Sequence, residues 1–215
     1  MSFKKTALLI CLAMVLFACS RTQPRIPFGF IELVYYSGDP LPYERFSFFV
    51  IAEDDDGIDN LGELRLYHDR EGLEWIIKSE DWVHYEEEGR HWTGSRNIAM
   101  TEDRNMPRGQ FRAVLLNKGG EKTERNFTFD APEEPRYAFP VLHIEGGYFI
   151  IESAYPSHTF MVYDQQGNLL RTVPVPSMEG YVIELRLPNT ARFLALWAQD
   201  ETYQTSAMTD VVSLR

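Results

Sequence analysis

The sequence predicts an all-β chain that forms two small antiparallel β-sandwiches in tandem. Three observations lead to this fold class. Segments of strand length recur about every eight to twelve residues, separated by turns rich in glycine, proline and aspartate. No stretch of residues 28–130 repeats its apolar residues with the period of a helix. A proline-rich segment then divides the strands into two sets of about seven.

The first element along the chain is an apolar leader. Lys4 and Lys5 precede an apolar run of twelve residues, Thr6–Phe17. This run is too short to cross the hydrocarbon core of a bilayer, which needs about 20 apolar residues. Its length is typical of the apolar region of a signal peptide.

The residues that follow resemble a processing motif. Leu16-Phe17-Ala18-Cys19 resembles the lipobox of bacterial lipoproteins, with a small residue directly before the cysteine. The resemblance implies cleavage after Ala18, transfer of diacylglycerol to the Cys19 thiol and acylation of the new amine. Two or three acyl chains anchor a protein firmly to a membrane. We therefore expect residues 1–18 to be a signal peptide and Cys19 to be the lipidated first residue.

Residues 19–27 are polar and contain two prolines, so we expect a short lipidated tether. In the usual sorting rule for lipoproteins, an aspartate after the cysteine retains the protein in the inner membrane. Ser20 stands there and favours the outer membrane. The expected location is thus the cell envelope, with the protein bound to a membrane through its lipid.

The first sandwich is predicted over residues 28–130. Tyr43–Ala52 is a continuous apolar run, which predicts a strand that is buried on both faces. Lys118-Gly119-Gly120-Glu121 predicts the turn of a hairpin. The other predicted strands are Phe28–Tyr36, Leu64–Tyr67, Leu73–Ile77, Gly109–Asn117 and Arg125–Phe129.

Residues 131–136 form the predicted linker, whose prolines and acids we expect to pack against neither sandwich. The second sandwich is predicted over residues 137–215, and we expect the two sandwiches to fold independently. Its predicted strands are Tyr137–Ile144, Tyr148–Glu152, Thr159–Tyr163, Leu169–Val173, Tyr181–Leu187, Phe193–Ala198 and Met208–Leu214.

Parts of both sandwiches resemble known modules. Ala52–Asp69 and Gly109–Asp130 resemble an acidic turn with its following strand, and the closing hairpin, of bacterial immunoglobulin-like domains. Ala191–Arg215 is similar to the last strands of fibronectin type III modules. These resemblances imply a fold and no activity.

Charge and cysteine content exclude several function classes. Removal of residues 1–18 takes away Lys4 and Lys5, which leaves 19 basic against 32 acidic residues and a formal charge of −13. Such a chain is repelled by phosphate backbones, so we expect no nucleic-acid partner. With Cys11 in the leader and Cys19 lipidated, no thiol remains for a disulfide, a metal site or catalysis.

An acidic turn, Glu53–Asn60, is the first candidate site. Calcium prefers about six to eight oxygen ligands, mostly from carboxylates. Asp54, Asp56 and Asp59 therefore suggest a weak structural calcium site. The alternative is a solvated loop in which aspartate is favoured by turn geometry, and no other cofactor is expected.

An aromatic segment over residues 75–92 is the second candidate site. Trp75, Trp82 and Trp92 lie there with Tyr85, and with His84, His91 and the acidic run Glu86–Glu88 among them. Aromatic faces and carboxylates together are able to hold a sugar or a cation. The alternative is a long hairpin whose rings pack against the sheet.

Signatures of catalysis are missing from the sequence. It contains no Gly-x-Ser-x-Gly, no His-Glu-x-x-His and no glycine-rich phosphate loop. We therefore expect a non-catalytic envelope lipoprotein that presents its sandwiches to an envelope protein or a cell-wall polymer. The rival is a carbohydrate- or small-ligand-binding protein that uses the aromatic segment. Two or more tryptophans with open faces along a groove would favour the rival, and buried rings would favour the first hypothesis.

Overall fold

The computed structural model describes residues 22–38, 42–87, 89–101 and 105–214. The signal peptide, Cys19 and Ser20 lie outside these residues. The described chain is all-β and arranged as sandwiches, which confirms the predicted fold class. The described residues contain no helix long and apolar enough to pass through a bilayer.

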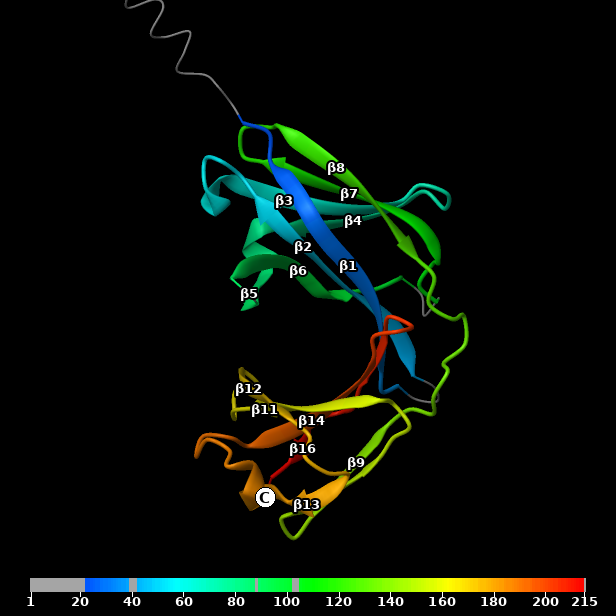
Figure 1. Cartoon of the computed structure of the whole chain (residues 1–215), viewed down its shortest axis with the longest axis vertical. Helices are drawn as coiled ribbons and strands as arrows, with labels where there is room; N and C mark the ends of the chain where they lie inside the picture. The colour runs from blue at the N-terminus through cyan, green and yellow to red at the C-terminus, as the bar shows by residue number, and fades with distance from the viewer. Residues whose placement is uncertain (1–21, 39–41, 88, 102–104, 215) are drawn as a thin grey trace, which may run out of the picture.

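The strands form three sheets (Figure 1). The largest has nine strands in the order β12-β11-β14-β15-β1-β2-β6-β5, with β16 paired to β14. Its strands are β1 (Arg25–Tyr36), β2 (Tyr43–Glu53), β5 (Val83–Glu87), β6 (Arg90–Ile98), β11 (Ser157–Tyr163), β12 (Leu169–Pro174), β14 (Phe193–Asp200), β15 (Thr205–Met208) and β16 (Val212–Ser213). The second sheet holds β4 (Leu73–Lys78), β3 (Leu61–His68), β7 (Gly109–Asn117) and β8 (Lys122–Phe129), and the third holds β13 (Glu179–Tyr181), β10 (Tyr148–Glu152) and β9 (Val141–Glu145). Three short 3-10 helices complete the described elements, η1 (Ile58–Asn60), η2 (Ser79–Asp81) and η3 (Val182–Leu185).

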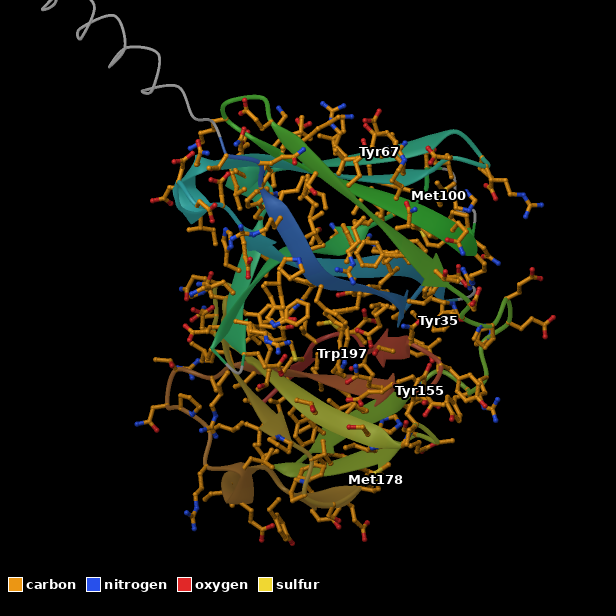
Figure 2. The ribbon with its side chains drawn as sticks, turned by 45° about the horizontal axis from the view of Figure 1, so that its top comes forward. Tyr35, Tyr67, Met100, Tyr155, Met178 and Trp197 are labelled. Atoms are coloured by element: carbon orange, nitrogen blue, oxygen red, sulfur yellow. The ribbon has the colours of Figure 1, made fainter. Side chains whose placement is uncertain are left out.

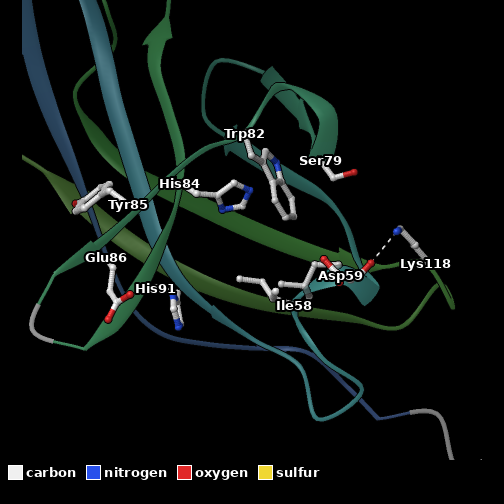
Figure 3. Close-up of a pocket in the computed structure, with 10 residues that line it drawn as sticks. Ile58, Asp59, Ser79, Trp82, His84, Tyr85, Glu86, His91 and Lys118 are labelled. Carbon is white, nitrogen blue, oxygen red and sulfur yellow. Dashed lines mark hydrogen bonds between the residues drawn. The ribbon is translucent and has the colours of Figure 1, made fainter. Parts of the chain in front are cut away.

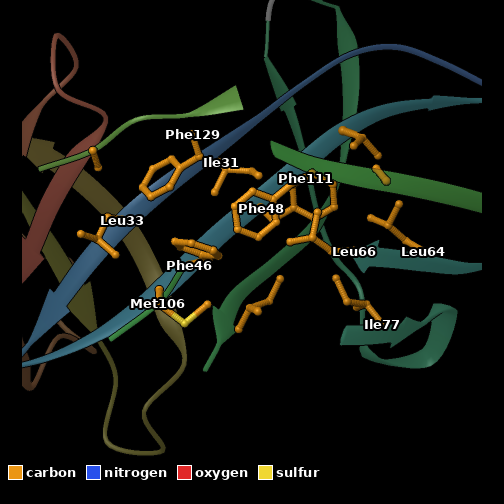
Figure 4. Close-up of a cluster of buried hydrophobic side chains, with 14 of the residues drawn as sticks. Ile31, Leu33, Phe46, Phe48, Leu64, Leu66, Ile77, Met106, Phe111 and Phe129 are labelled. Atoms are coloured by element: carbon orange, nitrogen blue, oxygen red, sulfur yellow. The ribbon is translucent and has the colours of Figure 1, made fainter. Parts of the chain in front are cut away.

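The core of the first sandwich lies between the nine-stranded sheet and the second sheet (Figure 4). Phe46 on β2 packs edge-on against Phe111 and Phe129, with ring centroids 5.4 and 4.9 Å apart. The other face of β2 buries Phe49 and Ile51 in a separate cluster with Trp92. β2 is therefore buried on both faces, as its continuous apolar run predicts.

The core of the second sandwich is smaller. Phe160 on β11 and Phe149 on β10 meet edge-on at 5.1 Å between the nine-stranded sheet and the third sheet. On β10 the buried residues Phe149 and Ile151 alternate with more exposed neighbours, whereas β11 buries Phe160, Met161 and Val162 in succession. The alternation on β10 indicates that the third sheet has one covered face.

The two sandwiches share one sheet. β1 pairs in parallel with β15, from Leu33 opposite Thr205 to Tyr36 opposite Met208. The first core also takes in Tyr155, Ala198 and Ala207 from the second half. Figure 2 shows Tyr35, Tyr155 and Trp197 together where the halves meet. The sandwiches are thus joined by backbone hydrogen bonds and packing as well as by the linker.

The linker contacts the sandwiches, and this part of the prediction was wrong. Ala131 is buried, and the carbonyl oxygens of Ala131 and Pro132 accept hydrogen bonds from the Arg108 guanidinium. Arg136 lies over the ring of Tyr203 at 4.1 Å. An unpartnered buried carbonyl is costly, so a linker that runs along a sandwich needs such donors.

The tether ends earlier than residue 27, because β1 begins at Arg25. The Arg25 side chain forms ion pairs with Glu53 and Asp55 at 3.3 and 2.8 Å. These two acids follow the apolar run of β2. Their negative charges attract Arg25 and favour the pairing of β1 with β2 at the start of β1.

We expect the whole chain to unfold in one cooperative transition, because a sheet and a core cross the boundary between the halves. Urea unfolding followed by the indole signals checks this expectation, since Trp197 reports on the second half and the other three tryptophans on the first. Coincident loss of all four signals is the expected result. Two separated transitions would instead support independent domains.

Candidate binding cleft on the concave face of the shared sheet

The acidic turn contains a hydrogen-bonded carboxylate. Asp54 Oδ1 accepts from the Asp56 amide at 2.8 Å, and Asp54 Oδ2 accepts from the side-chain amides of Asn60 and Asn117 at 3.2 and 3.3 Å. Asp56 accepts a hydrogen bond from Thr22 at 3.0 Å. Within the described residues, no group of three or more His, Cys, Asp or Glu side chains is placed to hold a metal ion. The calcium site at Asp54, Asp56 and Asp59 stays a prediction, with a melt in chelator and in calcium as its test.

Asp54 is expected to stabilise the turn without any metal. Replacing Asp54 with alanine leaves the Asn60 side-chain amide without its acceptor and takes one of two acceptors from Asn117, which also donates to the Thr22 carbonyl. We therefore expect a loss of about 1–2 kcal/mol. Urea unfolding in the presence of a chelator measures this loss. The exposed Asp59 is the control, because its described hydrogen bond, from Lys118, is accepted by the backbone oxygen, which alanine keeps. An equal effect of both variants would contradict this role of Asp54.

The three tryptophans of the second candidate site serve the packing of the sheets. Trp75 and Trp82 pack at the edge of the first core, and each indole N–H donates to a backbone carbonyl at 2.9 Å. Trp92 is 7% exposed and lies on the opposite face of the sheet. The tryptophans therefore do not form one row of open rings.

A shallow pocket of about 570 Å³ lies beside this segment (Figure 3). Of the three tryptophans, Trp82 lines it, together with His84, Glu86 and His91 from one face of the β5–β6 hairpin. His84 Nδ1 lies 3.0 Å from the Thr93 hydroxyl. Trp82 meets His84 edge-on at 5.9 Å, so its ring is already in contact within the pocket.

A larger cleft of about 740 Å³ lies where the two halves face each other. Figure 1 shows that the nine-stranded sheet curls, so that its end strands β5 and β12 lie on the same side of the molecule. The second and third sheets cover the convex side, and the concave face stays uncovered between them. Side chains from β12, β11, β14, β1, β2, β6 and β5 line the cleft.

One wall of the cleft is aromatic. The register of β1, β2, β6 and β5 places Phe28, Ile51, Trp92 and Tyr85 in one row across the sheet. The next row contains Phe30 and Phe49, whose rings lie 5.9 Å apart. Tyr85 is nearly parallel to Trp92 at 6.0 Å, and Phe28 is 48% exposed. Burial raises the pKa of the Tyr85 hydroxyl to about 12, so it is neutral at pH 7.

The floor of the cleft is polar. Glu32 on β1 is 8% exposed and lies opposite Ser47 of β2. Glu32 Oε1 accepts hydrogen bonds from the Ser206 hydroxyl of β15 and, at 2.9 Å, from the Gln199 amide of β14. Arg96 of β6 also lines the cleft, with its guanidinium 5.9 Å from the centre of the Phe49 ring.

The sequence did not predict this cleft, although Tyr85 of the aromatic segment lines it and Trp92 packs behind Tyr85. The alternation of Phe28, Phe30 and Glu32 against Ile31 and Leu33 was a usable signal of a strand with two distinct faces. The partner strands lie far along the chain, since Glu32 and Ser206 are 174 residues apart. No local pattern predicts that contact.

The sequence matches no family model. It matches no curated protein either.

Two solved structures are similar to the chain, both with low sequence identity and a low TM-score. Tp47, the 47-kilodalton lipoprotein of Treponema pallidum, is 14% identical with a TM-score of 0.40, over 87% of this chain and 50% of that one. Dimeric latent PorU from Porphyromonas gingivalis is 14% identical with a TM-score of 0.33, over 91% of this chain and 21% of that one. This chain thus spans half the length of the first protein and about a fifth of the second, and neither similarity assigns it a family.

Proposed function

We propose that the chain is a non-catalytic lipoprotein of the bacterial cell envelope, anchored to a membrane through Cys19, which binds an envelope protein or a cell-wall polymer in its cleft. The observation that carries this proposal is the cleft of about 740 Å³ on the uncovered face of the shared sheet. Binding sites are commonly concave, lined by apolar and aromatic side chains, with a few polar groups between them. The immunoglobulin-like and fibronectin type III-like assignments of the two sandwiches belong to the same proposal.

The lipid anchor would hold the fold close to the membrane. Only five residues lie between Cys19 and the start of β1 at Arg25, so the two residues are at most roughly 20 Å apart. The outer membrane is the proposed location, on the basis of Ser20.

Replacing Cys19 with serine is expected to leave an unprocessed precursor or to release the protein from membranes. Serine has no thiol to accept diacylglycerol, and the lipid supplies the anchor. Detergent phase partitioning with mass measurement checks this outcome. A variant that partitions fully with the detergent and has the wild-type mass would contradict the anchor.

Capture from detergent-solubilised envelopes tests binding in the cleft. Phe28→Asp introduces a charge on the aromatic wall, whereas Ile76→Asp introduces the same charge at a position of equal exposure on the second sheet, 50% against 48%. We expect wild type and Ile76→Asp to retain the same bound molecule and Phe28→Asp to lose it. Equal capture by both variants would place binding elsewhere. The recovered molecule should keep its mass after incubation with the protein, as a non-catalytic role requires.

A second candidate function is the binding of a carbohydrate or small ligand at residues 75–92. The observation in its favour is the pocket of Figure 3, lined by Trp82 with His84 and His91. Trp82→Ala would abolish binding in that case, while Phe28→Asp would leave it intact.

A further inference from the structure

We propose that the cleft takes an organic cation, an ammonium or guanidinium group, and that the carboxylate of Glu32 pairs with it. This inference rests on the proposed function, since it names the ligand chemistry of the same cleft. Three features of the described residues carry it: the position of Glu32, the balance of charge around it and the aromatic wall beside it.

Glu32 occupies the point where the two halves join. It projects from β1 to the concave face in the same direction as Phe28 and Phe30, because alternate residues of a strand share a face. Ser206 and Gln199 both donate to Oε1 and fix the carboxyl group from the side of the second half. A rigid, mostly buried carboxylate at the floor of an open cleft is prepared for a ligand that approaches from the cleft.

The charges of the cleft favour a cation. Three carboxylates line it, those of Glu32, Glu87 and Glu201, against one guanidinium, that of Arg96. In the described part of the chain, no carboxylate lies within 4.0 Å of the Arg96 nitrogens, and Arg96 acts on Glu32 at longer range. A buried carboxylate without a close counter-charge is costly. A ligand cation removes that cost, while a neutral ligand does not and an anion adds repulsion.

The aromatic wall would bind the rest of the cation. Phe28, Phe30 and Tyr85 present their rings on one side of Glu32, and Trp197 lines the cleft on the other. The negative faces of aromatic rings attract ammonium and guanidinium groups and also cover their alkyl stems. A carboxylate at the floor and rings at the sides therefore match an alkylammonium or alkylguanidinium group.

The protonation of Glu32 supports the same assignment. Burial raises the pKa of Glu32, while the hydrogen bonds from Ser206 and Gln199 and the charge of Arg96 lower it, and the charge of Glu201 raises it. Tyr85 and Glu87 are the titratable groups that line the cleft from β5. A bound cation would favour the ionised carboxylate, so binding should release protons and strengthen as the pH rises through the raised pKa of Glu32.

A pair of matched probes tests the proposal in the full folded domain. Nα-acetyl-lysine methylamide carries an ammonium group, and Nα-acetyl-norleucine methylamide has the same backbone with an uncharged alkyl side chain. Each is titrated while the Trp197 indole signal is followed by NMR, because Trp197 lines the cleft. We expect the lysine probe to shift this signal and to bind about tenfold or more tighter than the norleucine probe.

Glu32→Gln separates the role in binding from a structural role. Glutamine keeps the size of the side chain and an oxygen that accepts from Ser206 and Gln199, but it removes the charge. We expect unchanged or higher stability at neutral pH, since glutamine needs no ionisation in a buried place, together with a loss of binding of about tenfold or more. Glu145→Gln on β9, outside the cleft, is the matched control and should bind as wild type.

The outcomes distinguish a failure of the cation proposal from a failure of the proposed function. Equal binding of both probes, followed at Trp197, would contradict the preference for a cation. The cleft would still be a ligand-binding site. If Phe28→Asp and wild type capture the same molecule and no probe shifts Trp197, the proposed function fails as well. A third titration uses an extended basic peptide. Tighter binding of the peptide than of the lysine probe would identify the cation as a side chain of a protein partner. Equal binding would identify it as a small free cation.

Discussion

Replacing Arg108 with alanine is expected to lower the free energy of unfolding by about 3–5 kcal/mol, because it leaves a buried carboxylate without its counter-charge. The side chains of Arg108 and Glu44 are 15% and 5% exposed, and Arg108 Nη2 lies 2.9 Å from Glu44 Oε1. The Met106 amide also donates to Glu44, at 2.8 Å. Arg108 further donates to the carbonyls of Ala131 and Pro132, so the variant also releases the start of the linker.

Urea unfolding of a double variant shows whether the charge is the cause. Glu44→Gln combined with Arg108→Met removes both charges and keeps similar volumes, so we expect it to be more stable than Arg108→Ala. Part of the loss should remain, because the two linker carbonyls still lack their donor. Single and double variants of equal stability would show that the ion pair contributes little beyond these backbone contacts.

The strand pattern of the sequence is a good guide wherever neighbours along the chain pair with each other. The β7–β8 hairpin follows from Lys118–Glu121 as predicted, and β10 is predicted to the residue, Tyr148–Glu152. In such hairpins the turn fixes the register, so the signal and its cause lie within a few residues.

Prediction fails where distant contacts override the local pattern. The sequence predicts a strand over Tyr181–Leu187, but β13 ends at Tyr181 and η3 follows over Val182–Leu185. Only Leu185 is buried in η3. The segment packs against the small second core, with Leu185 buried and Val182 and Leu187 partly buried. Met208–Leu214 is likewise divided, since β15 pairs with β1 of the other half before β16 returns to β14.

The cleft depends on the same long-range pairing. Phe28, Phe30 and Glu32 would form an ordinary exposed face if β1 ended the sheet. Parallel pairing with β15 continues the sheet into the second half, so that this face becomes the aromatic wall and part of the floor of the cleft. Parallel strands need a long crossover, here most of the chain, so sequence pattern alone has no means of indicating the pair.

Gly94 on β6 is the position where one added methyl group should cause the second large loss. A Cβ atom built there would lie 2.0 Å from the Phe48 carbonyl oxygen and 2.8 Å from Phe49 Cα, and both are backbone atoms of the neighbouring strand. Backbone held in a sheet cannot rotate away as a side chain can, so Gly94→Ala must push β6 from β2. We expect a loss of about 3 kcal/mol in the free energy of unfolding, at the upper end of overpacking effects.

Gly62 on β3 provides the matched control for this substitution. The nearest atom to a Cβ at Gly62 is 3.6 Å away, which is ordinary van der Waals contact. Gly62→Ala should therefore change the stability by no more than about 0.5 kcal/mol. Urea midpoints of the two variants give the comparison, and similar midpoints would contradict the close packing of β6 on β2.

The same variant should also act on the cleft. β6 carries Trp92 and Arg96 and holds β5, with Tyr85, at the end of the sheet. Movement of β6 away from β2 would separate the Phe30–Phe49 row from Tyr85, whose ring now lies 5.1 Å from that of Phe49. Folded Gly94→Ala is thus expected to bind the lysine probe more weakly than folded Gly62→Ala does. Equal binding would mean that the aromatic wall tolerates the displacement of β6 and that the charge of Glu32 alone sets the affinity.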